Sequence, residues 1–367
     1  MTVPANSLGK NIGVLTSGGD CAGLNATIRA VVLAAAEKGW GTYGILNANG
    51  LLDSPPNVKF LTPDMVNGAV LRQGGTMLGT SSKGTFSPLA WPQPDGTLKD
   101  RSAEVLSAYQ SLNLQGLVVI GGDGSMGIFR EIAARTGLKF VGIPKTIDND
   151  VGATDVAVGF DTAVAVATEA LDRLQPTAAS HQRVMILEVM GRDAGHIALN
   201  AGIAGGADII LIPEMPYKLE NITNKIKAIQ ASGRSHALMV VSEAVKGVDG
   251  KKVMNKFADG KISYGGVGHH LSEEISQAMD AETRVTVLGH VQRGSSPTHF
   301  DRLIASAFGA HAVHLLSQGI TDQMVIWANR QVTNVPLAQA LDKYHEVDPQ
   351  GPLVATAHAL GICMGDR

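Results

Sequence analysis

Residues 116–125 read GLVVIGGDGS, a short apolar run that passes directly into a loop with three glycines. The run is typical of a strand that is buried on both faces. The apolar spacing that follows, as far as about residue 135, indicates a helix. Because this strand–loop–helix order recurs along the chain, the sequence predicts largely parallel sheets covered by helices on both faces.

Further apolar runs predict strands at residues 11–15, 42–46, 139–143, 183–189, 209–212, 237–242 and 284–288. Helical spacing predicts helices at about residues 24–38, 195–203, 221–231 and 302–317. Ligands of parallel sheets bind beyond the carboxyl ends of the strands. Polar, glycine-rich clusters follow five of the strands, at residues 16–20, 121–125, 144–150, 190–193 and 289–295. Two polar inserts, residues 83–101 and 246–261, are expected to be loops.

Composition narrows the class of protein. A chain of 367 residues, 44% of them hydrophobic, exceeds the usual size of one domain and predicts two. The formal net charge of −3 argues against nucleic-acid binding. No uninterrupted apolar stretch approaches the roughly 20 residues of a membrane span. Cys21 and Cys363 are too far apart in sequence to suggest a disulfide framework or a cysteine metal site, which fits a reducing cytoplasm.

The loop at residues 121–125 has the chemistry of a phosphate site. Gly121 and Gly122 allow the backbone to approach a phosphate closely, and the following helix presents unpaired N–H groups and a positive dipole end. Asp123 fits an anion-binding loop only if a cation joins it, and Mg²⁺ held by this carboxylate and by phosphate oxygens meets that need. On this segment alone, a glycine-lined turn remains the alternative.

Residues 144–150 read PKTIDND and place two carboxylates after an apolar strand. Asp148 and Asp150 are two residues apart, so in extended backbone they point to the same side. Phosphoryl transfer needs a base for the attacking hydroxyl and a ligand for the metal, and carboxylates supply both. A surface turn is the alternative, and the position directly after a buried strand favours a site.

Six segments resemble the signatures of the phosphofructokinase family, in the family's order, over about residues 11–315. They are GVLTSGGD (13–20), GGDGS (121–125), PKTIDND (144–150), HQR (181–183), EVMGR (188–192) and GHVQRG (289–294). NAD kinases and lipid kinases share a string like GGDGS but do not explain PKTIDND. A dinucleotide-binding dehydrogenase would need G-x-G-x-x-G after the first strand, which TSGGDCAG does not supply. A non-catalytic nucleotide sensor would have no need for Asp148.

The resemblance implies two Rossmann-like three-layer α/β/α domains with the active site in the cleft between them. Residues 1–159 plus about 292–345 would bind the nucleotide donor, and residues 160–291 plus about 346–367 the sugar phosphate. The implied enzyme is a cytoplasmic, glycolytic 6-phosphofructokinase that uses Mg²⁺. It would transfer the terminal phosphoryl group of ATP to the 1-hydroxyl of fructose 6-phosphate. A homo-oligomer, a dimer or tetramer with a substrate site shared between subunits, is also implied.

The same resemblance assigns roles to individual residues. Asp148 is expected to be the base, with Gly124, Lys145 and Arg192 also acting in catalysis, and Asp123 and Asp150 are expected to hold the metal. The residues expected to contact the donor are Gly19, Ser82, Lys83, Gly122, Asp123, Gly124 and Ser125. Those expected to contact the sugar phosphate are Thr146, Ile147, Asp148, Arg183, Met190, Gly191, Arg192, Glu243, Arg284, His290, Val291, Gln292 and Arg293. Of these, Arg183 and Arg284 are expected to reach in from a neighbouring subunit.

Two positions bear on the choice of donor. Pyrophosphate-using relatives carry an aspartate after GGD, where it crowds and repels the α-phosphate of a nucleotide; this chain has Gly124. Lys145, in contrast, resembles the pyrophosphate-dependent branch. Because a lysine can also pair with an ATP phosphate, Gly124 decides and predicts ATP, with pyrophosphate as the alternative donor.

Overall fold

A computed structural model of the chain describes residues 9–81, 87–247, 250, 254–256 and 262–367. The chain divides into two compact units. Unit 1 comprises Met1–Thr146, Val151–Asp161 and Arg293–Tyr344, and unit 2 comprises Ile147–Asp150, Thr162–Gln292 and His345–Arg367. The expected boundaries put Ile147–Asp150 in the first domain. A hydrogen bond from the main-chain N–H of His345 to the carbonyl of Asp150 ties this short segment to unit 2 instead.

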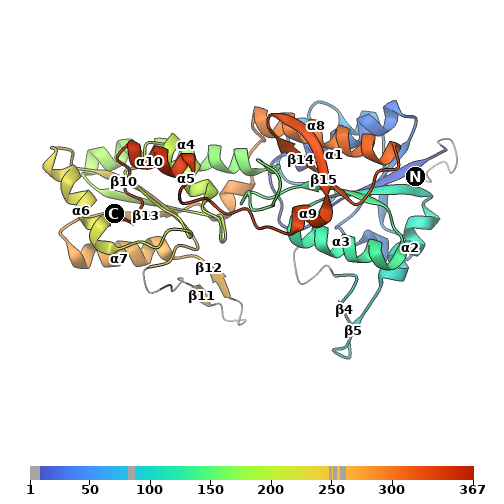
Figure 1. The fold of residues 1–367 in the computed structure, drawn as a ribbon, viewed down its shortest axis with the longest axis horizontal. Coiled ribbons are helices and arrows are strands. Elements are labelled where there is room, and N and C mark those ends of the chain that lie inside the picture. The colour runs from blue at the N-terminus through green and yellow to red at the C-terminus, as the bar shows by residue number, and fades with distance from the viewer. Residues whose placement is uncertain (1–8, 82–86, 248–249, 251–253, 257–261) are drawn as a thin grey trace. The chain divides into compact units, whose positions relative to one another are not determined.

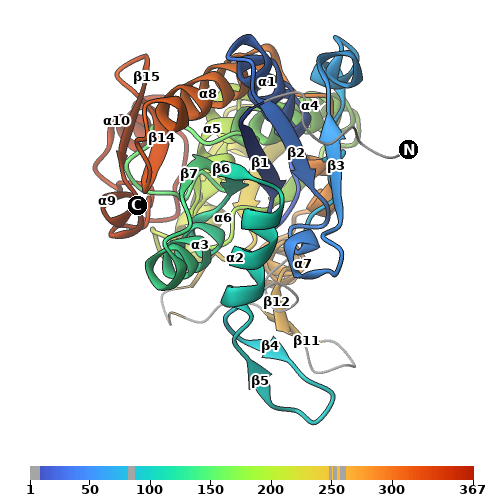
Figure 2. The ribbon, with the colours of Figure 1, turned by 90° about the vertical axis from the view of Figure 1, so that its right-hand side faces the viewer.

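Unit 1 contains a seven-stranded sheet in the order β15-β14-β7-β6-β1-β2-β3 (Figure 2). Its strands are β1 (Asn11–Thr16), β2 (Gly41–Ile45), β3 (Val58–Leu61), β6 (Leu114–Gly121), β7 (Phe140–Pro144), β14 (Gln323–Ala328) and β15 (Gln331–Pro336). The β2–β3 and β14–β15 pairs are antiparallel, and the other neighbours are parallel. The sheet is therefore largely parallel, as the apolar strands predicted.

Helices cover both faces of this sheet. They are α1 (Leu24–Glu37), α2 (Ser102–Ser111), α3 (Asp123–Thr136), α8 (His299–Ser317) and α9 (Leu337–Leu341), with 3₁₀ turns at Gly50–Leu52, Pro63–Val66 and Val70–Arg72. In Figure 1, α1 and α8 lie on one face and α2 and α3 on the other. Because strand side chains alternate between faces, Leu15, Leu117 and Val119 all reach the core beneath α3, where they meet Met126 and Phe129.

Unit 2 contains a four-stranded parallel sheet in the order β13-β8-β10-β9. Its strands are β8 (Val184–Val189), β9 (Ile209–Leu211), β10 (Ala237–Ser242) and β13 (Thr283–Val287). Its helices are α4 (Phe160–His181), α5 (His196–Ala204), α6 (Leu219–Ala231), α7 (Val267–Ala278) and α10 (Pro352–Ala359), and Gly289–Arg293 forms a 3₁₀ turn. Helices α6 and α7 lie on one face, where Ile226 and Leu271 pack on Ile186, Met239 and Val241 (Figure 1).

The strands and helices predicted from apolar spacing are confirmed, with bounds that differ by a few residues at most. Helices α2, α4, α7, α9 and α10 and strands β3, β14 and β15 were not predicted. In α4, the apolar face consists mainly of alanine and Pro176 interrupts the pattern. The inserts are also not simple loops. Strands β4 (Trp91–Pro92) and β5 (Leu98–Lys99) form one hairpin, and β11 (Met254–Lys256) and β12 (Ile262–Tyr264) form another. None of the helices in the described part of the chain has both the length and the apolarity to cross a membrane.

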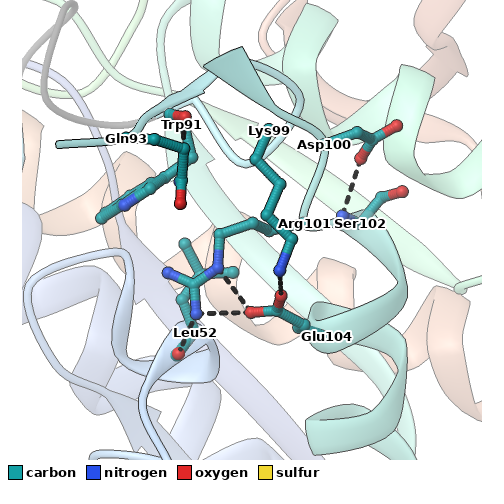
Figure 3. Close-up of polar contacts among 8 residues, drawn as sticks. All are labelled: Leu52, Trp91, Gln93, Lys99, Asp100, Arg101, Ser102 and Glu104. Atoms are coloured by element: carbon teal, nitrogen blue, oxygen red, sulfur yellow. Dashed lines mark hydrogen bonds and ion pairs between the residues drawn. The ribbon is translucent and has the colours of Figure 1, made fainter. Parts of the chain in front are cut away.

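The β4–β5 hairpin projects from the start of α2 and is fixed at its base (Figures 2 and 3). The guanidinium carbon of Arg101 lies 5.1 Å from the centroid of the Trp91 ring, a cation–π contact. Arg101 also donates to the carbonyl of Leu52 at 2.7 Å and pairs with the carboxylate of Glu104. These contacts anchor the insert to unit 1.

Candidate functional site

Three loops of unit 1 begin at the same edge of the sheet. Thr16 pairs in register with Ile120, and Gly121 pairs in register with Pro144, so β1, β6 and β7 end side by side. Main-chain hydrogen bonds continue across the loops, from Ser17 N to Ile120 O at 2.9 Å and from Lys145 N to Gly121 O at 3.0 Å. We call the segments 16–20, 121–125 and 144–145 the donor loops.

The loop after β1 is held by the main chain of its neighbours. Gly18 has a φ of 86°, a left-handed conformation that favours glycine. Its N–H donates to Ser81 O at 2.9 Å, and its carbonyl accepts from Thr80 Oγ1 at 2.6 Å. A side chain on Gly19 would place its Cβ 2.8 Å from Nη1 of Arg293, so the guanidinium group would have to move aside.

Two basic side chains hold this loop. Lys145 is only 4% exposed, and its Nζ donates to the carbonyl of Gly19 at 2.6 Å. Arg293 donates from Nη1 to the carbonyl of Asp20 at 2.8 Å. Beneath the loop, Ser125 Oγ donates to Ser17 Oγ at 2.9 Å. The donor loops therefore combine glycine backbone with positive charge, the combination that binds phosphate.

Helix α3 starts inside the donor loops. Gly122 is its N-cap residue, and Asp123 and Gly124 are its first two residues. The Oδ1 of Asp123 accepts from the N–H of Gly124 at 2.6 Å, which orients the carboxylate at the helix start. Within the described residues, no group of three or more His, Cys, Asp or Glu side chains forms a metal cluster.

A second set of loops lies at the carboxyl edge of the unit 2 sheet. Ser242 pairs with Val189, and Val287 pairs with Glu188, so β10, β8 and β13 also end together. The segments that follow these strands are bonded to one another. Met190 N donates to Gln292 Oε1 at 2.8 Å, and Arg192 N donates to Glu243 Oε1 at 3.1 Å.

The loop after β8 has an unusual backbone. Gly191 has a φ of 148° and Arg192 a φ of 51°, a left-handed value that is uncommon for a residue with a side chain. This conformation brings Nη1 of Arg192 to 3.7 Å from Oδ2 of Asp150. Asp148 and Asp150 are each 4% exposed. Unit 2 therefore brings together the carboxylate loop at Ile147–Asp150 and the residues that follow β8, β10 and β13.

The basic residues expected around the sugar 6-phosphate lie in separate places. Arg183 directly precedes β8 and Arg284 is the second residue of β13, whereas Met190 follows the far end of β8, roughly 23 Å from Arg183 at about 3.3 Å per residue. Their Nη2 atoms lie 2.9 and 2.5 Å from Oε1 of Glu282. Hydrogen bonding by Arg183, assisted by Arg284, lowers the pKa of Glu282. His290 is exposed in the 3₁₀ turn after β13.

The remaining expected residues are placed as follows. Thr146 is the last residue of the first segment of unit 1, Met1–Thr146, and its N–H donates to Val158 O at 3.2 Å. Ile147 is buried, and Val291 is 66% exposed in the 3₁₀ turn. Ser82 and Lys83 lie outside the described residues.

Three residues near the carboxylate loop had no signal in the sequence. His345 contacts the carbonyl of Asn149 through Nδ1 at 2.9 Å, and His196 contacts the carbonyl of His345 through Nε2 at 3.0 Å. The carboxylate of Glu214 accepts from the N–H groups of Gly195 and Val347, each at 2.9 Å. Burial raises the pKa of Glu214 despite these bonds. Each contact joins residues far apart in sequence, so no local sequence pattern predicts it.

His196 makes the stability of the fold depend on pH. Burial, with repulsion from His345, lowers the pKa of His196 from 6.5 to about 4. Between these values the unfolded chain binds a proton that the folded chain does not, so stability falls as the pH falls. The free energy of unfolding is expected to fall by about 2 kcal/mol by about pH 5.

We expect the melting temperature of the parent to drop more than that of His196→Gln between about pH 7.5 and about pH 5. Equal drops in the two proteins would contradict the assignment of this pH dependence to His196.

Comparisons with known proteins agree with this arrangement. The phosphofructokinase family model matches residues 11–316. ATP-dependent 6-phosphofructokinase 1 of Nostoc sp. is 55% identical over 361 residues, covering 98% of this chain and 100% of that protein. Its namesake from Synechocystis sp. is 54% identical over 359 residues, covering 97% and 99%. The structure of phosphofructokinase from Saccharomyces cerevisiae is 27% identical with a TM-score of 0.76; the match covers 96% of this chain and 47%, about half, of the yeast chain. The chain belongs to the phosphofructokinase family, as its six motifs predicted.

Proposed function

We propose that the chain is an ATP-dependent 6-phosphofructokinase of glycolysis. It transfers the terminal phosphoryl group of ATP to the 1-hydroxyl of fructose 6-phosphate and yields fructose 1,6-bisphosphate and ADP. The observation that carries this proposal is the convergence of the donor loops, where three parallel strands end beside Lys145 and Arg293. The names of the cyanobacterial relatives, which match nearly the whole chain, support the same activity.

The donor loops hold the phosphates of ATP. The N–H groups of Gly19 and Gly122 and the hydroxyl of Ser125 are the expected contacts, and the start of α3 adds the positive end of a helix dipole. Lys145 supplies the positive charge at this edge. Gly124 leaves space beside the α-phosphate, which supports ATP over pyrophosphate. Contacts from Ser82 and Lys83 stay predictions.

The carboxylates at the proposed site fit a magnesium ion. Mg²⁺ usually takes one or two protein carboxylates and completes its shell with water and substrate phosphates. Asp123, oriented at the start of α3 by its bond to Gly124 N–H, is such a carboxylate. Asp150 is the expected second ligand. A bound Mg²⁺ would neutralise charge on the transferred phosphoryl group.

In unit 2, Asp148 accepts the proton of the 1-hydroxyl as that oxygen attacks the terminal phosphorus and the bond to the ADP oxygen breaks. Arg192 lies beside the carboxylate loop and is placed to offset negative charge as it develops. Thr146, directly before this loop, and Ile147, its first residue, position the sugar. Two buried polar atoms beside the residues that follow β8, Nε2 of Gln292 and Oγ of Ser242, have no hydrogen-bond partner among the described residues. Such atoms support binding of a polar ligand here.

The rest of the sugar phosphate would meet residues at two places. Glu243, with Met190 and Gly191, faces the sugar hydroxyls, and His290, Val291, Gln292 and Arg293 form the segment expected at the 6-phosphate. Arg183 and Arg284 lie at the opposite end of the strands, paired with Glu282. That placement supports a role in which they bind the sugar phosphate in the site of a neighbouring subunit, in a cytoplasmic dimer or tetramer. Guanidinium groups suit this task because they bind phosphate through paired hydrogen bonds.

Asp148→Asn tests the activity and the base together. We expect parent protein with Mg²⁺ and fructose 6-phosphate to form fructose 1,6-bisphosphate fastest with ATP in a panel of ATP, ADP, GTP and pyrophosphate. The variant should lose about 10²–10⁴-fold in kcat, because general-base catalysis is worth that much. Asp280→Asn, which changes an exposed aspartate of unit 2, is the control. Parent protein inert with every donor, or a variant within a few-fold of the parent, would refute the proposal.

Gly124→Asp tests the donor choice. The new carboxylate should crowd and repel the α-phosphate and reduce turnover with ATP by at least about tenfold, since like charges in contact cost several kcal/mol. Turnover with pyrophosphate should fall less. Gly127→Asp is a matched control, because it adds the same charge on the same helix at an exposed position with open space around it. Undiminished ATP turnover in Gly124→Asp would contradict the assignment of the donor pocket.

A further inference from the structure

The segment that follows β15 and α9 returns to the carboxylate loop of unit 2. The main-chain N–H of His345 donates to the carbonyl of Asp150 at 3.0 Å. The ring Nδ1 of His345 lies 2.9 Å from the carbonyl oxygen of Asn149. One residue therefore binds two consecutive peptide groups of Ile147–Asp150.

The contacts fix the tautomers of two histidines. A carbonyl oxygen accepts hydrogen bonds but cannot donate, so Nδ1 of His345 must carry a proton. The same reasoning applies to Nε2 of His196, which lies 3.0 Å from the carbonyl of His345. The two rings lie in a tilted contact, with their centroids 4.6 Å apart and an interplanar angle of 40°. His196 therefore donates to the main chain of His345, and the ring of His345 donates to the carbonyl of Asn149 in the carboxylate loop.

The residues that follow His345 in the C-terminal segment of unit 2, which we call the tail (His345–Arg367), are also bonded to unit 2. Val347 is buried, and its N–H donates to Oε1 of Glu214 at 2.9 Å. The same carboxylate accepts from the N–H of Gly195, directly before α5. His196 is the first residue of α5 and contacts the carbonyl of His345 directly. Glu214 links Gly195, just before the same helix, to Val347. The residues on both sides of Glu346 are therefore held near the start of α5.

The loop turns sharply at the bonded residue. Asn149 has a φ of 54°, a left-handed conformation that asparagine adopts more readily than other residues with a side chain. The carbonyl that His345 binds belongs to the peptide group that joins Asn149 to Asp150, one residue after Asp148. A shift of this part of the loop would reach Asp148 through the backbone of Asn149.

We propose that His345 is a positioning residue, whose ring N–H holds the loop in the conformation that aims Asp148 at the acceptor hydroxyl. This role rests on the proposed function of Asp148 as the base. A catalytic group displaced by about 1 Å can lose about 10²-fold in rate, so a contact that sets its backbone acts on kcat although it never meets the substrate.

The first test compares two variants of His345 in the full-length protein. His345→Ala removes the ring donor but keeps the main-chain N–H, whereas His345→Asn places an amide N–H near the position of Nδ1. We expect kcat to fall about tenfold in His345→Ala, with the KM for ATP within about twofold of the parent, and to recover to within about threefold in His345→Asn. In an Asp148→Asn background, His345→Ala should cause no further loss, because the two residues act through one group.

His358→Ala is the matched control. His358 lies in α10, in the same C-terminal part of unit 2, and contacts Asp366 and Arg367 rather than the carboxylate loop. It should leave kcat unchanged. Equal losses of kcat in His345→Ala, His345→Asn and His358→Ala would reduce His345 to a general structural residue and overturn the proposal.

A second readout does not depend on activity. Hydrogen–deuterium exchange should be faster at the amides of the peptides that contain residues 147–151 in His345→Ala, and close to the parent's in His345→Asn. Unchanged exchange in His345→Ala would overturn the proposal even if kcat fell. Parent protein inert with fructose 6-phosphate and every donor would refute the proposed function instead, and the exchange result would still decide whether His345 holds the loop.

Discussion

The hydrogen bond from the buried amine of Lys145 to the carbonyl of Gly19 ties the end of β7 to the loop after β1. Strand β6 lies between these two strands, so the bond reaches across the edge at which three parallel strands end. A buried charged amine is costly unless it is bonded, and here its partner is the loop proposed to hold the donor. The conformation of Gly18 and Gly19, and with it the proposed phosphate site, depends on this bond and on that from Arg293.

The heptapeptide PKTIDND links this constraint to the acceptor chemistry. Pro144, Lys145 and Thr146 belong to unit 1, and Ile147–Asp150 belongs to unit 2. Lys145 is three residues before Asp148 in the chain, so the residue that braces the donor loops and the proposed base lie in one short segment. Each end of the segment is held by a contact from a distant part of the chain. Lys145 bonds the β1 loop, and Asn149 is bonded by His345 of the tail.

Much of the fold could be predicted from the sequence, because buried parallel strands have a distinctive apolar pattern. The strands and the glycine-rich loops at their ends are where the pattern placed them. Helices α2, α4, α7, α9 and α10 and strands β3, β14 and β15 were not predicted. In α4, alanines and Pro176 blur the helical periodicity. Both polar inserts contain short hairpins. The β4–β5 hairpin is held at its base by the cation–π contact of Arg101 with Trp91, and such a contact is not visible in composition.

The candidate site could be predicted only in part. The glycines and aspartates stand in contiguous motifs, and the structure brings those of each unit together. The surroundings of the arginines could not be predicted: Arg293 bonds the carbonyl of Asp20, and Arg183 and Arg284 pair with Glu282. His345 gave no signal, because its proposed role comes from contacts with two main-chain carbonyls that lie 195 and 196 residues away in sequence.

The most direct measurement of the central constraint is the dissociation constant of ATP for the parent protein and for Lys145→Met. Methionine is an unbranched side chain of similar length that carries no charge and no donor. The variant should bind ATP at least about tenfold more weakly, since a charged hydrogen bond is worth about 1.5–3 kcal/mol and its loss also frees the Gly19 loop. A dissociation constant within about twofold of the parent value would contradict the account.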